Sequence, residues 1–553
     1  MSQEKGKNES RAPRREKLFA DPTGVFVQDV LLQACQRFAN QTFLIDTSCV
    51  EPRHISYGDF GALAESAARG LVASGLQPGE RVGIHLFNSW EYVVAYYAVT
   101  LAGAIPTPLN PSYREREIRH QLENSGASML ITDGPLIADV NLSELPALRR
   151  IYATRDLAFT GADSFAELLI PKKVSLPSPR SSSDSAIAAL PYSSGTTGLP
   201  KGVMLTHRNL VANNYQLLGA DGAPFSDGEI ILCSIPLYHI YGLNVLLNPA
   251  LSLGATLVLL PRFDVSKACR FIQEFGITFL PVVPPMLKSL CEACEQGVFP
   301  CENRIRWAKS GAASLSAELA HRFTSSTGIR VGQGYGMTEC SPVAFLGSWE
   351  DRWFHPDSIG TPVALTECRL MDEQRKEVSN GEIGEIVVRG PQVMLGYWNA
   401  PDATAEVLSS SAETNSSANA PTPGAKDLWY RTGDLGRQDE DGFYYVVGRL
   451  KELIKFKGFS VAPGEVESVL LEHPAVRDCC VVGRPDAVAG EVPCAFVVLR
   501  DGFTAGSRIA TELSGYVAER LAAYKQPRDV HFVDSIPHSP SGKILRRVLR
   551  ESL

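Results

Sequence analysis

Residues 191–202 read P-Y-S-S-G-T-T-G-L-P-K-G, with two serines, two threonines, three glycines and one lysine in twelve positions. Apolar residues 186–190 precede this segment and apolar residues 203–205 follow it, which predicts a strand, a glycine-rich loop and a second strand. Glycines allow the backbone to turn and to direct several N–H groups at one point. The hydroxyls add hydrogen-bond donors, and Lys201 adds a positive charge. We therefore predict that this loop binds a polyphosphate.

The loop differs from the best-known phosphate loop, G-x-x-x-x-G-K-[ST]. Lys201 follows Pro200, and Gly202 stands where that motif requires serine or threonine. A solvated Ser/Gly linker is the alternative interpretation of such a composition. A linker does not explain why a proline and a lysine close a run of hydroxyls between two apolar strands, so we favour phosphate binding.

The segment from Pro191 to Val203 resembles the phosphate loop of the adenylate-forming enzymes, which include acyl-CoA synthetases, 4-coumarate–CoA ligases, firefly-type luciferases and peptide-synthetase adenylation domains. Further matches recur in the family's order almost to the C-terminus. The resemblance implies an α/β fold, with a large N-terminal domain of layered α/β subdomains and a small mobile C-terminal α+β domain. We expect a disordered tail over 1–25, an AMP-binding domain over 26–448, and a mobile domain over 449–553 that hinges at Lys451.

The composition is that of an ordinary globular protein: 553 residues, 44% hydrophobic and 21% charged, with a formal net charge of -8. This balance argues against a general nucleic-acid binder. The 12 scattered cysteines favour a reduced cytoplasmic compartment. Residues 1–17 lack the apolar core of a signal peptide. The longest apolar stretch, 241–260, is interrupted by Asn, Pro and Gly, which predicts a buried helix, a turn and a strand and no transmembrane segment. Peripheral membrane contact, and the choice between monomer and homodimer, remain open.

Hydrophobic periodicity predicts helices that alternate with short strands, which is typical of a largely parallel sheet. The expected helices are 30–38, 60–74, 90–102, 114–124 and 208–218, and the expected strands are 81–86, 104–108 and 129–132. Beyond residue 448 we expect a small unit with two strands, 479–482 and 495–499, and helices over 463–471 and 509–521.

Residues 332–339, G-Q-G-Y-G-M-T-E, match a second signature of the family. Tyr335 offers a flat face for a base, Thr338 a hydroxyl for the α-phosphate, and Glu339 a hard oxygen ligand for Mg²⁺. In Y-R-T-G-D-L, the carboxylate of Asp434 can accept hydrogen bonds from both ribose hydroxyls. The resemblance also implies that residues 311–313 contact adenine.

The resemblance assigns these positions residue by residue. The implied catalytic residues are Lys543, Lys201, Glu339 and His239, with Glu339 also the metal ligand. The implied nucleotide- and CoA-binding residues are Ser193, Ser194, Gly195, Thr196, Thr197, Gly198, Gly311, Ala312, Ala313, Gln333, Gly334, Tyr335, Gly336, Thr338, Asp434, Arg449, Lys451, Lys455, Lys457, Gly458 and Arg262. The implied substrate pocket contains Tyr241, Asn244, Val245, Lys309, Pro342 and Val343.

The implied reaction uses ATP, Mg²⁺, coenzyme A and a small carboxylic acid. The carboxylate attacks the α-phosphate of ATP, pyrophosphate leaves, and the thiol of CoA then attacks the acyl-adenylate. Charge develops on phosphate oxygens, so the site needs cations and preorganised donors. Lys543 is expected to bridge the carboxylate and the α-phosphate. A rotation of the small domain about Lys451 is then expected to replace Lys543 by the loop over 455–458.

The identity of the acid is ambiguous at this stage. Most of the pocket positions resemble 4-coumarate–CoA ligases, but Val245 replaces a small, often hydroxylated residue and cannot pair with a phenol. Residues 358–360 and 391–398 resemble bacterial long-chain fatty acyl-CoA synthetases. We expect a long- or medium-chain fatty acid, with 4-coumarate or another aryl acid as the alternative. Ser460, which stands where 4-coumarate–CoA ligases carry glutamine, leaves the role of its position open.

Other classes are less well supported by the motifs. A luciferase-type oxygenase shares the adenylation half of the chemistry and stays open. A nucleotide-binding pseudoenzyme would have lost a catalytic group, yet Lys201, Glu339, Asp434 and Lys543 are all present. An amino-acid adenylation domain would want an aspartate near His239, and none stands there.

Overall fold

The structure is a computed structural model, and it describes residues 22–155, 161–178, 182–193, 200–219, 228–348, 354–410, 428–457, 459–486, 488–538 and 543–553. Several sequence predictions lie outside these residues: Ser194 to Gly198 of the phosphate loop, Gly458, and nearly all of the expected N-terminal tail. The side chain of Ser460 is likewise not described.

A nine-stranded, mostly parallel sheet forms the largest layer of the molecule. Its strand order is β17-β16-β15-β14-β13-β11-β12-β1-β2. The bounds are β1 (Thr42–Asp46), β2 (Arg53–Ser56), β11 (Ile230–Cys233), β12 (Thr256–Leu259), β13 (Phe279–Val282), β14 (Trp307–Ser310), β15 (Val331–Gly336), β16 (Val343–Leu346) and β17 (Thr361–Pro362). Its flanking helices are α1 (Val27–Arg37), α5 (His207–Leu218), α6 (Asn248–Leu253), α7 (Val265–Glu274), α8 (Pro284–Glu295) and α9 (Ala317–Thr327), with a π-helical turn at Gly242–Leu247.

A second, parallel sheet has the order β4-β3-β5-β6-β7. Its strands are β3 (Arg81–His85), β4 (Ile105–Pro108), β5 (Ala127–Thr132), β6 (Arg150–Ala153) and β7 (Asp163–Ser164), and its helices are α2 (Tyr57–Ala73), α3 (Trp90–Leu101) and α4 (Glu115–Ser125), with 3₁₀ turns at Gly134–Leu136 and Phe165–Leu169. Ser89 caps α3 by accepting the N–H of Tyr92, and every residue of α3 from Tyr92 to Leu101 is buried. This helix is apolar all round because it lies inside the common core.

Two antiparallel sheets complete the large unit. The first has the order β20-β10-β8, with β9 also paired to β10; the second has the order β18-β19-β22-β21, with β23 paired to β22. The bounds are β8 (Ile187–Ala189), β9 (Tyr192–Ser193), β10 (Lys201–Thr206), β20 (Gly396–Tyr397), β18 (Glu367–Met371), β19 (Gly384–Arg389), β21 (Leu408–Ser409), β22 (Trp429–Gln438) and β23 (Tyr444–Arg449), with α10 at Pro401–Val407 and a 3₁₀ turn, η4, at Thr338–Cys340.

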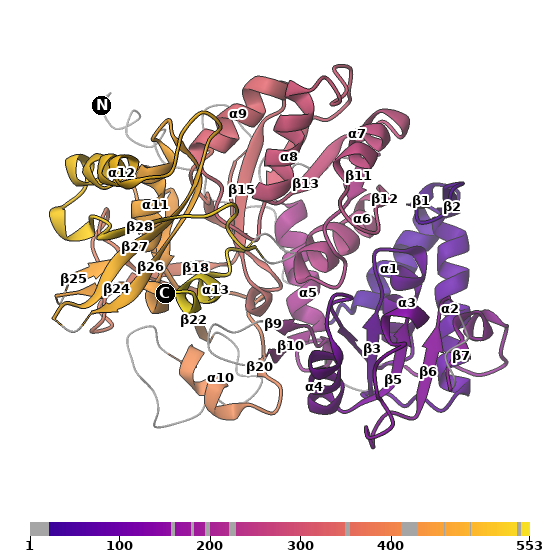
Figure 1. Cartoon of the computed structure of the whole chain (residues 1–553). Helices are drawn as coiled ribbons and strands as arrows, with labels where there is room; N and C mark the ends of the chain where they lie inside the picture. The colour runs from indigo at the N-terminus through magenta and orange to yellow at the C-terminus, as the bar shows by residue number, and fades with distance from the viewer. Residues whose placement is uncertain are drawn as a thin grey trace, which may run out of the picture.

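Residues 454–553 form a smaller unit around a separate apolar core. Its sheet has the order β25-β24-β27-β26, with β28 paired to β27. The bounds are β24 (Ile454–Phe456), β25 (Phe459–Val461), β26 (Val476–Asp486), β27 (Gly490–Leu499), β28 (Asp529–Phe532), α11 (Pro463–Leu471), α12 (Ser507–Arg520) and α13 (Arg546–Glu551), with 3₁₀ turns η6 (Leu450–Glu452) and Ala523–Lys525. Figure 1 shows this unit in orange and yellow, at the opposite side of the molecule from β3, β5 and β6.

The mixed α/β architecture, with a large and a small unit, is the one predicted from the sequence. One expectation was wrong: the small unit has a five-stranded sheet and not two strands. The three missed strands, β24, β25 and β28, do alternate apolar and polar residues, but they are so short that periodicity alone does not identify them. Their strand state depends on pairing with β27 and β24. The apolar stretch 241–260 forms helix, turn and strand as expected, with Gly254 in the left-handed conformation at the turn. Among the described residues, no helix is long and apolar enough to cross a membrane.

Candidate active site

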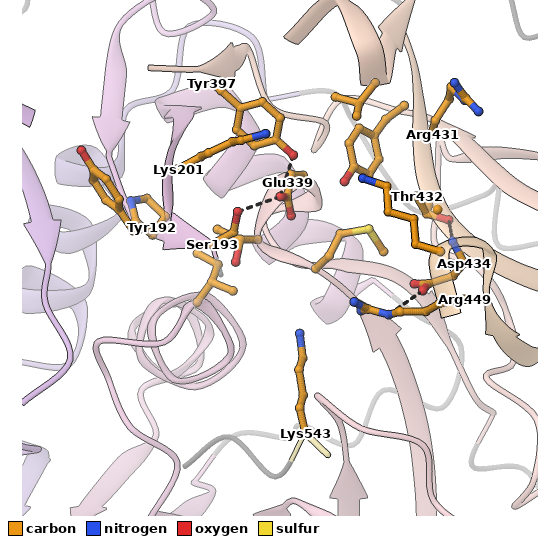
Figure 2. Close-up of a pocket in the computed structure, with 18 of the residues that line it drawn as sticks. Tyr192, Ser193, Lys201, Glu339, Tyr397, Arg431, Thr432, Asp434, Arg449 and Lys543 are labelled. Carbon is orange, nitrogen blue, oxygen red and sulfur yellow. Dashed lines mark hydrogen bonds and ion pairs between the residues drawn. The ribbon is translucent and has the colours of Figure 1, made fainter. Parts of the chain in front are cut away.

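A cavity of about 1250 Å³ lies where the large and small units meet. Its walls come from the end of β9, the start of β10, η4, the β22 and β23 strands, and the segment that begins at Lys543. Figure 2 shows side chains from these separate elements around one space. Strand pairing explains part of this convergence, because Lys201 lies opposite Ser193 and Val203 lies opposite Tyr397.

Glu339 is the acidic centre of one wall. Its side chain is buried, and its Oε1 accepts hydrogen bonds from Ser193 Oγ at 3.0 Å and from the Tyr397 hydroxyl at 2.9 Å. The ammonium of Lys201 lies 5.3 Å from the centroid of the Tyr397 ring. This wall therefore presents a carboxylate and a lysine side by side, as Figure 2 shows.

The opposite wall holds a second network. The Tyr335 hydroxyl donates to Asp434 Oδ2 at 2.6 Å, and Arg449 Nε lies 3.0 Å from Asp434 Oδ1. Asp434 and Arg449 face each other because Asp434 on β22 pairs with Arg449 on β23. Burial raises the pKa of Asp434 above its ordinary value, and the Arg449 guanidinium opposes that shift. Burial, followed by the charge of Asp434, raises the pKa of Tyr335, so the phenol stays a donor.

Lys543 projects into the cavity from the small unit. Burial lowers the pKa of its ammonium, as does the nearby Arg449, whereas Glu339 and Asp434 act in the opposite direction. The lysine thus stands among groups from both walls, even though it lies far after all of them in the chain (Figure 2).

His239 is neutral at physiological pH. Burial, with a smaller contribution from the Lys543 cation, lowers its pKa to about 4. The backbone N–H of Tyr241 donates to Nδ1 at 3.2 Å. The neutral ring therefore carries its proton on Nε2, where it can donate a hydrogen bond but supplies no positive charge.

A smaller cavity of about 70 Å³ adjoins the large one. The two cavities share His239, Ile240, Met337, Thr338 and Lys543. The predicted site residues on the wall of the smaller cavity are Tyr241, Val245, Lys309, Gly311, Ala312, Gly334, Tyr335, Gly336, Pro342 and Val343. The hydroxyl of Ser310, also on this wall, is buried and makes no hydrogen bond to any described residue.

Several predicted residues do not line either cavity. Asn244 is buried behind the wall, where its amide donates to the carbonyls of Leu210 and Ser341. Gln333 exchanges hydrogen bonds with the backbone of Leu315. Ala313 and the predicted CoA contacts also lie off these walls: Arg262 lies 4.2 Å from the ring centroid of Phe87, Lys455 lies 3.3 Å from Glu373, and Lys457 is exposed. Lys451 does line the large cavity.

The structure adds residues that the sequence argument did not assign to the site. Tyr397, Tyr430, Arg431 and Thr432 line the large cavity. The last three immediately precede Gly433 and Asp434 in the Y-R-T-G-D-L motif, so adjacency could have identified them. Tyr397 carries no local signal, because tertiary contacts bring it to Glu339: β20 pairs with β10, and the Met394 N–H donates to the Glu339 carbonyl.

The donor set fits a magnesium ion carried by a polyphosphate. Both hydrogen bonds to Glu339 fall on Oε1, and Oε2 accepts none from the described residues. In the same part of the chain, no group of three or more His, Cys, Asp or Glu side chains could hold a metal alone. Mg²⁺ is commonly bound through one or two carboxylates, with substrate phosphates and water as the other ligands.

Comparisons with known proteins agree with this geometry. The family described as AMP-binding enzyme matches residues 31–398, and its C-terminal domain matches residues 465–543. The chain is 36% identical over 542 residues to 4-coumarate--CoA ligase 5 of Oryza sativa subsp. japonica, covering 97% of this chain and 96% of that protein. It is 35% identical over 524 residues to 4-coumarate--CoA ligase 1 of Petroselinum crispum, covering 93% and 92%.

Solved structures with a similar fold include a CoA ligase and a coenzyme A synthetase. An anthranilate CoA ligase in complex with anthranoyl-AMP has a TM-score of 0.83 at 26% identity, covering 96% of this chain and 97% of its own. O-succinylbenzoate coenzyme A synthetase from Bacillus subtilis, in complex with ATP and magnesium ion, has a TM-score of 0.77 at 30% identity, covering 94% and 99%.

Proposed function

Because this chain belongs to the AMP-binding enzyme family, we propose that it is an ATP-dependent, AMP-forming acid–CoA ligase whose substrate is a compact aryl acid of the hydroxycinnamate class. The observation that carries the proposal is the junction of the two cavities. Thr338, His239 and Lys543 face both the large cavity and the small one. A carboxylate held in the small cavity would thus meet the α-phosphate of ATP held in the large one.

The residues at the junction suit the first half-reaction. The Lys543 ammonium can contact a carboxylate oxygen and an α-phosphate oxygen at once, which offsets their repulsion during attack. Thr338 and the Nε2–H of His239 supply neutral donors at the same place. On the wall of the small cavity, Tyr335 can stack on a base. On the wall of the large cavity, Asp434 can accept hydrogen bonds from ribose hydroxyls, while Lys201 and Ser193 can contact the departing pyrophosphate.

Mg²⁺, which Glu339 would hold, neutralises charge on the β- and γ-phosphates when bound. Ser193 and Tyr397 hold the Glu339 carboxylate in place through Oε1. In the second half-reaction the CoA thiol attacks the acyl carbon and AMP leaves. We propose that the small unit rotates about Lys451 for this step, because Lys455 and Lys457 lie away from the cavity in the present arrangement.

Three observations support an aryl acid over the fatty acid that the sequence favoured. The small cavity measures about 70 Å³, which favours a compact acid over a long chain. The curated relatives named above are 4-coumarate–CoA ligases. The buried Ser310 hydroxyl is a third point, because a polar substituent on the acid would satisfy it. Val245, which cannot pair with a phenol, favours an unsubstituted or medium-chain acid as the second candidate.

The test gives the protein ATP, Mg²⁺, CoA and an equimolar mixture of 4-coumaric, cinnamic, octanoic and palmitic acids, and identifies the thioesters by mass spectrometry. We expect the aryl thioesters to dominate. Predominant palmitoyl-CoA would overturn the choice of acid and keep the mechanism. AMP without any thioester would instead show that CoA is the wrong acceptor.

The Val245→Ser variant separates the two candidates further. A hydroxyl at this position can pair with the ring hydroxyl of 4-coumarate, so we expect the ratio of kcat/KM for 4-coumarate over cinnamate to rise about tenfold. The Val245→Ala variant enlarges the cavity equally without a hydroxyl and serves as the control. If Val245→Ser and Val245→Ala give the same ratio of kcat/KM, the ring hydroxyl of 4-coumarate does not lie beside residue 245.

A further inference from the structure

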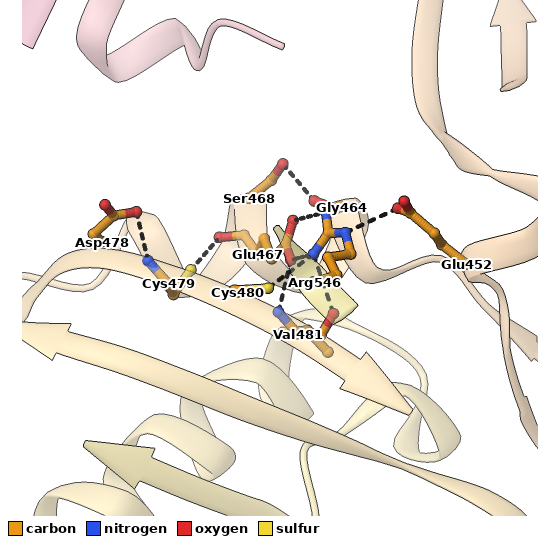
Figure 3. Close-up of polar contacts among 9 residues, drawn as sticks. All are labelled: Glu452, Gly464, Glu467, Ser468, Asp478, Cys479, Cys480, Val481 and Arg546. Atoms are coloured by element: carbon orange, nitrogen blue, oxygen red, sulfur yellow. Dashed lines mark hydrogen bonds and ion pairs between the residues drawn. The ribbon is translucent and has the colours of Figure 1, made fainter. Parts of the chain in front are cut away.

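Arg546, the first residue of α13, is the hub of a buried polar network outside the cavity. Its side chain is only 19% exposed. Nε lies 2.8 Å from Glu452 Oε2, and Nη2 lies 3.0 Å from Glu467 Oε2. Nη1 contacts Glu467 Oε1 and donates to the carbonyl of Val481 at 3.2 Å. Figure 3 shows the guanidinium between these partners.

The partners belong to three different elements. Glu452 ends η6, directly after Lys451, while Glu467 lies on α11 and Val481 on β26. Glu467 also accepts the backbone N–H of Val481 at 2.6 Å, so it is hydrogen-bonded on both sides. A planar guanidinium with several fixed donors is suited to joining three elements in one orientation.

Lys543 precedes this hub by three residues. Between them, Ile544 forms an isolated bridge with His538, and the Leu545 N–H donates to the Pro537 carbonyl at 2.9 Å. Helix α13 itself is short, and its buried residue is Leu549, which packs in an apolar cluster with Cys480 and Val482. The position of the Lys543 backbone therefore depends on how firmly α13 is attached to the small unit.

We propose that Arg546 is a positioning residue for the adenylation half-reaction. It fastens the Lys543 segment to the small unit and to Glu452, so that the hinge and the lysine move as one body. This inference rests on the proposed function, because it requires that Lys543 act in adenylation. Arg546 does not line either cavity and touches no reacting atom.

A purely structural role makes a different prediction from a positioning role. Loss of a structural residue weakens the small unit as a whole and slows both half-reactions alike. Loss of a positioning residue slows the step that needs Lys543 and spares the step that does not. A displacement of the catalytic group by about 1 Å can cost roughly a hundredfold in rate.

The experiment compares Arg546→Gln with the natural protein in two assays. Adenylation is followed as pyrophosphate release from ATP and 4-coumaric acid without CoA. Thioester formation is followed from synthetic 4-coumaroyl-AMP and CoA without ATP. We expect adenylation to fall about 10- to 100-fold and thioester formation to change less than about threefold. Arg546→Lys keeps the charge without the fork and should restore adenylation in part.

Arg547→Gln is the matched control. Arg547 lies on the same helix and carries the same charge, but its side chain is 86% exposed, and among the described residues it pairs with Glu551 alone, at 3.6 Å. We expect Arg547→Gln to catalyse both half-reactions at the rates of the natural protein. Equal losses in the two half-reactions of Arg546→Gln, or no loss of adenylation, would overturn the proposal.

Two further measurements keep the test decisive. Arg546→Gln leaves Glu467 buried without its partner, and Arg546→Gln/Glu467→Gln removes both charges if the single variant fails to fold. The reactivity of Lys543 toward acetic anhydride, mapped by mass spectrometry, should rise severalfold in the variants and stay unchanged in Arg547→Gln. This readout does not need turnover. If the natural protein makes no acyl-AMP, the proposed function fails, while unchanged Lys543 labelling in the variants would defeat the positioning role itself.

Discussion

Tyr397 is a single residue that serves two charged groups of the site. Its hydroxyl donates to Glu339 at 2.9 Å, and its ring lies under the ammonium of Lys201. Tyr397→Phe removes the hydroxyl and keeps the ring. A hydrogen bond to a charged group contributes about 1.5–3 kcal/mol. We therefore expect Mg²⁺ to bind more weakly, with an apparent dissociation constant for Mg²⁺ in adenylation that is roughly tenfold higher or more.

Calorimetric titration of the Mg²⁺ dependence of ATP binding provides the measurement without turnover. Tyr445→Phe is the control, because the Tyr445 hydroxyl also donates to a carboxylate, Asp439 Oδ2 at 2.9 Å, but outside the cavity. An unchanged Mg²⁺ dependence in Tyr397→Phe would show that Glu339 does not need this hydrogen bond to bind the metal.

Lys543 also determines how adenylation should respond to pH. Burial lowers the pKa of its ammonium, so the proton is lost at a lower pH than from an ordinary lysine. The charged form is the one that bridges carboxylate and phosphate. We therefore expect kcat/KM for adenylation to fall as the pH rises through this lowered pKa. Lys543→Arg keeps its charge and should remove the alkaline fall, at a lower maximal rate. A fall that persists in Lys543→Arg would assign it to another group.

At the scale of elements, the turn between β15 and η4 places Thr338 and Glu339. A Cβ built on Gly336 would collide with the backbone carbonyl of Pro342, so a side chain there must displace the turn. We expect Gly336→Ala to reduce adenylation at least tenfold and to lower the melting temperature measured by calorimetry.

Gly515→Ala is the control for that substitution. Gly515 lies within α12, and its added Cβ would meet nothing within 4 Å. Alanine is favoured over glycine in a helix by up to about 1 kcal/mol, so this variant should keep its activity and melt slightly higher. A Gly336→Ala enzyme with natural adenylation would mean that the turn adapts without moving Glu339.

The elements also show what the sequence could and could not predict. Alternating helices and strands such as α3 and β5 carry local periodicity, and the structure has them where they were expected. The walls of the cavity were predictable where a motif is contiguous, as for Tyr335 to Glu339. The contact between Tyr397 and Glu339 was not, because an antiparallel pairing between β10 and β20 joins segments far apart in the chain. The network around Arg546 was missed because its partners, Glu452 and Glu467, are likewise far from it in the chain.

At the scale of the whole molecule, two exposed ion pairs among the described residues join the large and small units. Arg500 Nη2 lies 2.8 Å from Glu318 Oε1, and Lys455 Nζ lies 3.3 Å from Glu373 Oε1. Glu318 lies on α9 and Glu373 follows β18, so both belong to the large unit. If the small unit rotates between half-reactions, these pairs stabilise the arrangement that holds Lys543 in the cavity. Breaking them should therefore favour the rotated arrangement in which the thioester forms.

The double variant Glu318→Gln/Glu373→Gln tests this balance without altering any residue of the cavity. Exposed ion pairs contribute about 0.2–1 kcal/mol each, so loss of both pairs should raise the ratio of the thioester rate to the adenylation rate about two- to thirtyfold. Salt screens such pairs. The same ratio should therefore increase with NaCl in the natural protein and depend little on NaCl in the variant. A ratio that is unchanged by both the substitutions and salt would mean that the exposed pairs do not bias the arrangement of the two units. The attraction of Lys543 to the carboxylates of Glu339 and Asp434 would then account for that arrangement.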